Sequence, residues 1–400
     1  MSSTAVMSWA SAHSVRLDTE AAAGEVAASI REKLGKGPLD LVLAFYSPSH
    51  VGSAQTLASV LRRELEPTCL AGSSAHGVVT MRREIETGPA LSVVAARLPG
   101  ATISPFIISQ EVWSEQARDP VSFRTLTPGV EGAELVILLA DPMSLDVQGV
   151  LEAFHQHHRG MRIVGGMASA GQRPGANALI LNDWLSREGG IGIALGGAIT
   201  IDVAVSQGCR PVGPALEVTR AEGNLVVELD GQSALERTEQ ILMELGEKDR
   251  ERLRNGLYVG RPLKVGAAGH GDYLIRNLLG ADRNRGALAV GDFLRPKEHI
   301  RLHVRDGESA KEDLQMVLSP QAFDRKAEAA LLFSCNGRGQ GLFGEPDHDI
   351  LTLQDALGGA VPCAGMFCAG EIGPVGERNF VHGHTASIAI VRSKTEAPAA

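Results

Sequence analysis

Three stretches of the chain repeat one pattern of apolar and polar positions. Each begins with an apolar run of strand length, which starts at Leu41, Leu135 or Leu331. The run is followed by a stretch whose apolar residues recur at helical spacing, and then by a pair of glycines. The pairs share one internal spacing and are Gly72 with Gly77, Gly166 with Gly171, and Gly365 with Gly370. Such self-similarity indicates an internal repeat, here a strand–helix–strand unit in three copies.

The sequence after each copy indicates further strands that can pair antiparallel with it. The strand-like segments are 90–98, 189–205 and 384–392. We therefore predict an α/β fold of repeated strand–helix–strand units that form mixed sheets. A chain of 400 residues exceeds what one core usually fills, so we expect two domains. The boundary is placed in 209–217, where prolines and glycine interrupt the periodicity. Residues 1–210 then hold two copies, and residues 211–400 hold the third copy and the main ligand site.

Composition narrows the class of partner. The net charge of −9 argues against a nucleic acid, which calls for a basic surface, and against an anionic membrane. Aromatic residues make up 4% of the chain, so stacking platforms for bases are scarce. The N-terminal segment lacks the features of a signal peptide, and no apolar run is long enough to span a bilayer. The 5 cysteines, an odd number, favour free thiols in a reducing compartment. We therefore expect a cytoplasmic protein that binds neither nucleic acid nor membranes.

Residues 331–350 join a buried-strand pattern to a dense group of polar residues. The apolar run ends at Cys335, and glycines at alternate positions follow it. Ligands of open α/β sheets bind at this place, past the C-terminal end of a strand. Convergent backbone N–H groups and the fork of Arg338 can hold a ligand carboxylate there, whereas a tight connection with structural glycines is the alternative. Asp347 or Asp349 is a candidate cap for the helix that follows. The candidate ligand-binding residues of this stretch are Cys335, Asn336, Gly337, Arg338, Gly339, Glu345 and His348.

A second dense stretch covers residues 368–390. Glu371 lies among small and apolar residues, so its carboxylate, if buried, needs a partner, either a ligand amine or an arginine of the chain. His382 and His384 lie on one face if the segment is a strand, but no complete ligand set for a metal is fixed, so we predict no metal site. Strand-end loops meet at one sheet edge, so Arg338 and Glu371 are expected to face a common cleft. The candidate ligand-binding residues here are Glu371, Asn379, His382 and His384.

The two dense motifs resemble the C-terminal domain of the FIST family, the F-box and intracellular signal transduction proteins. The resemblance runs from about Ala215 to Val391, and weaker N-terminal motifs are similar to the FIST N-terminal domain from about Leu39 to Val205. It implies an intracellular sensory module that binds small ligands, amino acids being proposed for many members, and some bacterial relatives are haem-binding gas sensors. We expect neither an output domain nor an F-box in this chain. We therefore expect the signal to pass to a separate partner protein such as a kinase or cyclase.

Two classes of function follow from these residues. The first is a stand-alone sensory protein that binds an amino acid or a similar polar metabolite, with no cofactor predicted; a haem-binding gas sensor is its variant. The second is an enzyme in which Cys335 is the nucleophile, helped by a histidine such as His348 or His384. The sequence has neither the spacing of a catalytic triad nor a nucleophile elbow, so we expect a binding protein rather than an enzyme.

Overall fold

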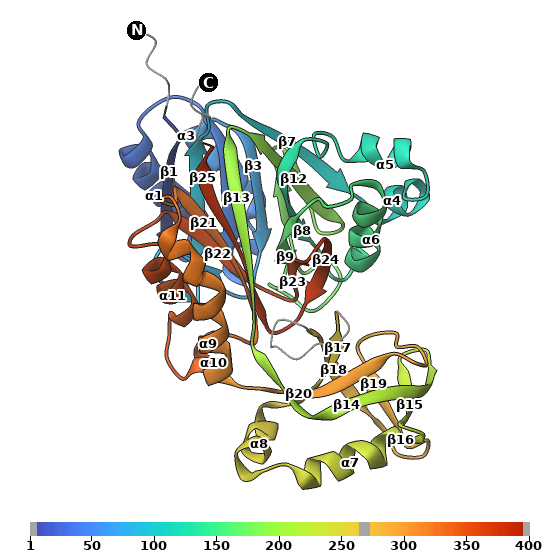
Figure 1. Cartoon of the computed structure of the whole chain (residues 1–400). Coiled ribbons are helices and arrows are strands. Elements are labelled where there is room, and N and C mark those ends of the chain that lie inside the picture. The colour runs from blue at the N-terminus through green and yellow to red at the C-terminus, as the bar shows by residue number, and fades with distance from the viewer. Residues whose placement is uncertain (1–5, 264–272, 395–400) are drawn as a thin grey trace, which may run out of the picture. The chain divides into compact units, whose positions relative to one another are not determined.

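The computed structural model describes residues 6–263 and 273–394, which form two compact units (Figure 1). The first unit is built from described residues within Met1–Val205, Val317–Val381 and Ala386–Ala400. The second is built from those within Ser206–Met316 and His382–Thr385. Along the chain, the first unit gives way to the second between Val205 and Ser206, close to the predicted boundary at residue 210. The division after it differs from the predicted one, because the third copy of the repeat packs with the first two.

The three copies contain the same series of strands, with one or two helical segments after the first strand and one or two after the second. The first copy comprises β1 (Ser8–Ser14), α1 (Thr19–Leu34), β2 (Leu39–Tyr46), α2 (Pro48–Val51), α3 (Ala54–Leu65), β3 (Pro67–Ser74), β4 (Val78–Val79), β5 (Glu84–Ile85) and β6 (Leu91–Arg97). The second comprises β7 (Ala101–Ile108), α4 (Gln110–Gln116), α5 (Pro120–Leu126), β8 (Ala133–Ala140), α6 (Val147–His157), β9 (Ile163–Met167), β10 (Leu179–Leu181), β11 (Trp184–Ser186) and β12 (Gly190–Gly197). The third comprises β13 (Ile199–Gln207), α9 (Gly307–Leu318), η3 (Ser319–Phe323), β21 (Ala329–Cys335), α10 (Gln340–Phe343), α11 (His348–Ala356), β22 (Cys363–Cys368), β23 (Glu371–Val375), β24 (Arg378–His382) and β25 (Thr385–Ser393).

The repeat predicted from the apolar pattern is confirmed. Leu41, Leu135 and Leu331 occupy the same place near the start of β2, β8 and β21. Each of these strands pairs in parallel with the next long strand of its copy: β2 with β3, β8 with β9, and β21 with β22. The parallel partners are joined through helices, as a parallel pair requires. On its other side, each strand pairs antiparallel with β6, β12 or β25. The predicted α/β class with mixed sheets is therefore confirmed.

One edge of each sheet is supplied by another copy. The hairpin β4–β5 of the first copy pairs with β22 of the third. The hairpin β10–β11 of the second copy pairs with β3 of the first, and β23 of the third pairs with β9 of the second. The described part of the first unit thus contains three six-stranded sheets that exchange edge strands in a ring. No copy completes its sheet without a neighbour.

The inner faces of the three sheets share one apolar core. Leu41, Leu135 and Leu331 are all buried in it, together with Phe45 and Phe333. The rings of Phe45 and Phe333, from the first and third copies, meet edge to face at 5.8 Å between centroids. Burial of large apolar side chains is the main favourable term in folding, so this shared core ties the copies together.

Helices cover the outer faces, and the sequence explains their extent. In α3, Leu57, Val60, Leu61 and Leu65 recur at helical spacing and are buried, which forms one apolar stripe. The helix ends at Glu66, whose backbone is left-handed with φ of 46°, and Pro67 then begins β3. Proline cannot continue a helix, so the chain turns into the sheet at this point.

The second unit interrupts the third copy, and it also takes in the last two residues of β13 and α9 as far as Met316. In the first two copies the corresponding strand and helix, β1 with α1 and β7 with α4, follow each other directly. Its described strands form one seven-stranded sheet in the order β14-β20-β17-β18-β19-β15-β16. Its elements are β14 (Cys209–Glu222), β15 (Leu225–Leu229), β16 (Gln232–Ser233), α7 (Ala234–Glu244), α8 (Glu247–Arg252), η1 (Leu253–Asn255), β17 (Leu257–Pro262), β18 (Tyr273–Asp282), β19 (Ala287–Val290) and β20 (His299–Arg305).

Candidate functional site

The glycine-rich loop connects β21 to α10 by a tight turn. The N–H of Asn336 donates to the carbonyl of Cys368 on the neighbouring strand at 3.0 Å, and the N–H of Arg338 donates to the carbonyl of Cys335 at 2.8 Å. Gly339 has φ of 70°, and a Cβ there would lie 2.6 Å from the carboxylate of Glu86. A side chain at this position would be strained and would clash, so the turn needs glycine.

Carboxylates of the first copy occupy the backbone donors of this segment. The N–H of Gln340, at the start of α10, donates to Glu86 Oε1 at 2.8 Å. The N–H of Ile350, in the first turn of α11, donates to Glu84 Oε1 at 2.9 Å. The backbone N–H groups at the start of these two helices therefore bind two glutamates of the protein, which lie in and next to β5. Asp347 does not cap α11 with its side chain, because that carboxylate accepts the N–H of Glu84 at 2.6 Å.

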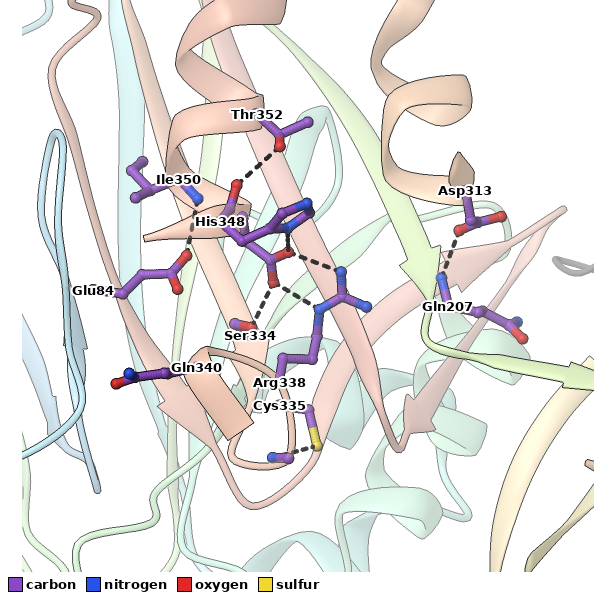
Figure 2. A network of polar contacts seen from close by, with 12 residues as sticks. Glu84, Gln207, Asp313, Ser334, Cys335, Arg338, Gln340, His348, Ile350 and Thr352 are labelled. Atoms are coloured by element: carbon purple, nitrogen blue, oxygen red, sulfur yellow. Dashed lines mark hydrogen bonds and ion pairs between the residues drawn. The ribbon is translucent and has the colours of Figure 1, made fainter. Parts of the chain in front are cut away.

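Arg338 and Asp349 form a buried, two-pronged ion pair (Figure 2). Arg338 Nε donates to Asp349 Oδ2 at 2.6 Å, Nη2 donates to Oδ1 at 2.9 Å, and both side chains are fully buried. Ser334 on β21 donates to Oδ2 at 3.1 Å. Burial alone would raise the pKa of Asp349, but the Arg338 charge holds that pKa well below its usual range. The fork predicted for a ligand carboxylate is therefore used inside the protein, and Asp349 is not a helix cap.

Two rings fix the orientation of this pair. His348 stacks on Phe343 with ring centroids 3.8 Å apart and planes 20° from parallel. His348 Nδ1 lies 3.1 Å from Asp349 Oδ1, and the Arg338 guanidinium carbon lies 5.2 Å from the Phe343 centroid. The face of the Phe343 ring and the carboxylate of Asp349 together hold the Arg338 guanidinium in one orientation. We name the group formed by Ser334, Arg338, Phe343, His348, Asp349 and Glu84 the Arg338 cluster.

Glu84 completes the cluster with an unusual carboxyl group. The residue is 6% exposed, and its Oε2 has no hydrogen-bond partner among the described residues. Burial raises the pKa of Glu84 to about 8, and the charge of Asp349 adds to this effect. Glu84 is therefore mainly neutral at pH 7 and can donate a hydrogen bond as well as accept one.

Arg338 keeps one nitrogen that the cluster does not use. Its Nη1 is buried and has no hydrogen-bond partner in the part of the chain that the structure describes. A buried guanidinium N–H without an acceptor costs free energy on the order of 1–3 kcal/mol. Buried polar groups of native proteins are nearly always paired, so this donor indicates a place for an acceptor.

Cys335 lies near Arg338, at the end of β21. Its side chain is on the same face of β21 as Leu331 and Phe333, and Cys335 stands opposite Cys368 in the parallel register. The N–H of Gly337 lies 3.4 Å from Cys335 Sγ. The negative charge of a thiolate at Cys335 would contribute to the raised pKa of Arg338, after Asp349. The thiol and the guanidinium are therefore close enough to interact.

The other predicted residues are dispersed. Asn336 and Glu345 are exposed. Glu371, at the start of β23, is fully buried opposite Gly166. Asn379 links β24 to the second copy, because its side chain donates to the carbonyl of Met161 at 2.7 Å and accepts the N–H of Ile163 at 2.8 Å.

The two histidines do not share a strand face as expected. β24 ends at His382, and the backbone of His384 is left-handed with φ of 63°, which breaks the strand alternation. Both belong to the second compact unit. In that unit His384 Nε2 lies 3.2 Å from Asn277 Oδ1, and its ring packs on Tyr258 at 4.3 Å. No group of three or more metal-ligating side chains occurs among residues 6–263 and 273–394.

Residues 40–232 match the model of the FIST N domain, and residues 234–374 match that of the FIST C domain. The chain belongs to the FIST family. The family resemblance stated from the sequence is thus confirmed for both domains. The border between the FIST models falls inside the second compact unit, so it does not coincide with the division of the fold. The Arg338 cluster draws Glu84 from the FIST N match and its remaining members from the FIST C match.

Relatives with nearly the same length are known in mycobacteria. The chain is 36% identical over 386 residues to an uncharacterized protein of Mycobacterium tuberculosis (strain CDC 1551 / Oshkosh). The alignment covers 93% of this chain and 96% of that protein. The chain is 34% identical to an uncharacterized protein of Mycobacterium bovis (strain ATCC BAA-935 / AF2122/97) with the same coverage. Among solved structures, a cyanuric acid hydrolase from A. caulinodans aligns with 98% of this chain and 100% of its own, at 9% identity and a TM-score of 0.39. A likeness of that degree says nothing of activity.

A helix that crosses a bilayer must be long and apolar. Within residues 6–263 and 273–394, no helix combines the length and apolar character that crossing a membrane requires.

Proposed function

We propose that this FIST protein is a stand-alone sensory protein that binds a small polar metabolite, with an amino acid as the leading ligand class. The FIST family is associated with sensing in signal transduction. The observation that carries the ligand-binding part is the buried, unused Nη1 of Arg338. The ligand would supply the missing acceptor through a carboxylate or carbonyl oxygen, and a separate partner such as a kinase or cyclase would receive the signal.

A second buried arginine shows what a purely structural role looks like. Arg392 is 1% exposed, and all three of its nitrogens have partners. Nε donates to the carbonyl of Arg325, Nη1 to Asp202, and Nη2 to Gln321. Arg338 is held as firmly through Nε and Nη2, yet keeps one donor free. This difference is what a preformed recognition group requires, because its orientation is fixed before the ligand arrives.

The electrostatics of the cluster favour an oxygen acceptor over an isolated charge. Asp349 neutralises Arg338, and Glu84 is mainly neutral at pH 7. The cluster then carries no excess charge, but it presents a strongly polarised N–H group in a dry environment. Hydrogen bonds from an ionised donor are stronger than neutral ones, so one such contact can anchor a small acid.

The test compares Arg338→Lys with Arg392→Lys in the full chain. Calorimetric titration with each of the twenty amino acids measures affinity, and thermal melting measures stability. Both variants are expected to melt earlier than the wild type, because each loses forked contacts in a buried site. Only Arg338→Lys is expected to lose affinity, by about tenfold or more, which corresponds to one charge-assisted hydrogen bond. Equal affinity in the two variants would contradict the ligand-binding role.

The contact between the Gly337 N–H and Cys335 Sγ favours one alternative, a thiol-dependent enzyme. A backbone donor and the nearby Arg338 charge would both stabilise a thiolate, which is the reactive form of cysteine. Cys335→Ser separates the two functions. A sensor keeps its ligand affinity after this change, whereas an enzyme that uses Cys335 as nucleophile loses turnover.

A further inference from the structure

A pocket of about 350 Å³ lies in the first unit, formed by residues other than those of the Arg338 cluster. Strand β1, helix α1 and the turn between β4 and β5 build its walls. Its lining residues are Ser11, Ala12, His13, Ser29, Lys33, Thr80, Met81, Arg82 and Arg83. We call it the Lys33 pocket. Its volume suits a small ligand.

Three cations surround this pocket without an acidic partner. Among the residues described, neither Lys33, Arg82 nor Arg83 forms an ion pair, although many arginines elsewhere in the chain do. Lys33 Nζ instead donates to the carbonyl of Ser11 at 2.6 Å, which holds the ammonium at the pocket wall. In a chain whose net charge is −9, a pocket that gathers unpaired cations is an exception that calls for an anion.

The turn that carries the two arginines is rigid. The N–H of Thr80 donates to the carbonyl of Arg83 at 2.8 Å. The Thr80 hydroxyl donates to the same carbonyl at 3.1 Å and accepts the N–H of Arg83 at 3.0 Å. The next residue, Glu84, is bonded to Asp347 and Ile350 through its backbone and side chain. The backbone that carries the exposed Arg82 and Arg83 is therefore held in place, so little backbone freedom is lost when they bind a ligand.

The imidazole of His13 reports the positive field inside the pocket. Burial lowers the pKa of His13, and the charge of Arg83 lowers it further. Lys33 acts in the same direction, whereas Glu25 opposes both. Two cations from different elements thus lie near enough to one ring of the pocket lining for both charges to lower its pKa.

We propose that the Lys33 pocket binds a small, multiply charged anion that carries phosphate groups. Lys33 and one or both arginines supply charge, and guanidinium groups suit the paired oxygens of a phosphate. The Ser29 hydroxyl, which also lines the pocket, can donate to a further oxygen. This site is separate from the proposed amino-acid site at Arg338, and either can exist without the other.

The test uses inorganic pyrophosphate as the probe, in calorimetric titrations of the full chain at constant ionic strength. Arg82→Ala with Arg83→Ala removes two pocket cations. Arg118→Ala with Arg173→Ala is the matched control, because it removes the same charge from two exposed arginines that do not line the pocket. The pocket variant is expected to bind about tenfold more weakly or worse, since two charge-assisted contacts are lost, and the control is expected to stay within about twofold of the wild type.

A second measurement locates the anion. In proton NMR titrations, saturating pyrophosphate is expected to raise the pKa of His13, because the anion offsets the fields of Arg83 and Lys33. His13→Gln identifies the resonance. Absence of pyrophosphate binding to the wild type, equal weakening in both double variants, or an unmoved His13 pKa at saturation would each overturn the proposal. Amino-acid titrations of the same variants show whether the Arg338 site still functions, so the two proposals fail separately.

Discussion

Arg338 donates two hydrogen bonds to Asp349, at 2.6 and 2.9 Å, and neither side chain is exposed to solvent. The pair joins the loop after β21 to the first turn of α11. Glu84, from the first copy, closes the same region by accepting the N–H of Ile350. The polar residues beside the glycines thus bind one another, and one donor, Nη1 of Arg338, has no hydrogen-bond partner among the described residues.

Asp349→Asn is expected to lower the free energy of unfolding by about 3–5 kcal/mol. The change leaves the buried charge of Arg338 without a counter-charge, and breaking a buried pair on one side costs that much. Glu152→Gln is the matched control, because the Arg378–Glu152 pair has a similar distance of 2.6 Å but side chains that are 48% and 42% exposed. Its loss should cost about 1 kcal/mol or less. Urea unfolding measures both, and equal losses would contradict the role of the buried pair.

Glu84 makes stability depend on pH in a defined window. Its pKa is raised from 4.5 to about 8 in the folded protein, so the folded state binds the proton more tightly than the unfolded state. The stability that Glu84 contributes is then complete below about pH 4.5, falls as the pH rises, and is lost above about 8. Glu84→Gln removes this dependence, so its free energy of unfolding should fall less steeply than that of the wild type across the window. Urea unfolding at a series of pH values tests this, and parallel curves for the two proteins would refute it.

The close approach of β21 and β22 requires a glycine at position 365. A Cβ at Gly365 would lie 1.9 Å from the carbonyl oxygen of Leu332, so the strands would have to separate. Gly365→Ala is expected to destabilise the protein by about 2 kcal/mol or more. Gly341→Ala, in α10, is the control, because no atom beyond its chain neighbours and its own helix backbone lies within 4 Å of its added Cβ, and its effect should be within about 1 kcal/mol. A similar melting temperature for both variants would contradict the packing described.

A fragment of residues 206–400 is not expected to fold into a soluble, ligand-binding protein. It would lack β4, which pairs with β22, and most of β13, which pairs with β25. The inner face of the third copy, including Phe333, would also lose its partners from the shared core. Expression of the fragment, followed by circular dichroism and amino-acid titration, tests this expectation. A well-folded fragment that binds ligand would show that the halves of the chain are independent.

The features that could be predicted from the sequence are those that depend on a local pattern of residues. The equivalence of Leu41, Leu135 and Leu331 follows from apolar periodicity, and the structure places all three at one position of the repeat. The loop after β21 was likewise found from its glycines and its place at a strand end. The exchange of edge hairpins was missed, because β4 and β5 are too short to leave a periodic signal.

The partners within the site were also beyond local pattern. Glu84 and Ile350 are hydrogen-bonded although 266 positions separate them in the sequence, and no residue near either one indicates the other. The sequence makes Asp349 a candidate helix cap, because a carboxylate at the start of a helix has that common role. Its pairing with Arg338 depends on how α10 folds back, which the sequence does not specify. The sequence does contain one indication of the site, because Phe343 precedes His348 at a spacing that permits the two rings to stack once the loop turns.

The most direct test of the ligand-binding account is native mass spectrometry of the full chain as purified. It is applied to the wild type, Arg338→Lys and Arg392→Lys. The account predicts a bound small molecule with an acidic or carbonyl group on the wild type and on Arg392→Lys, and its loss from Arg338→Lys. Equal occupancy in all three proteins, or no adduct on the wild type even after incubation with the twenty amino acids, would contradict it.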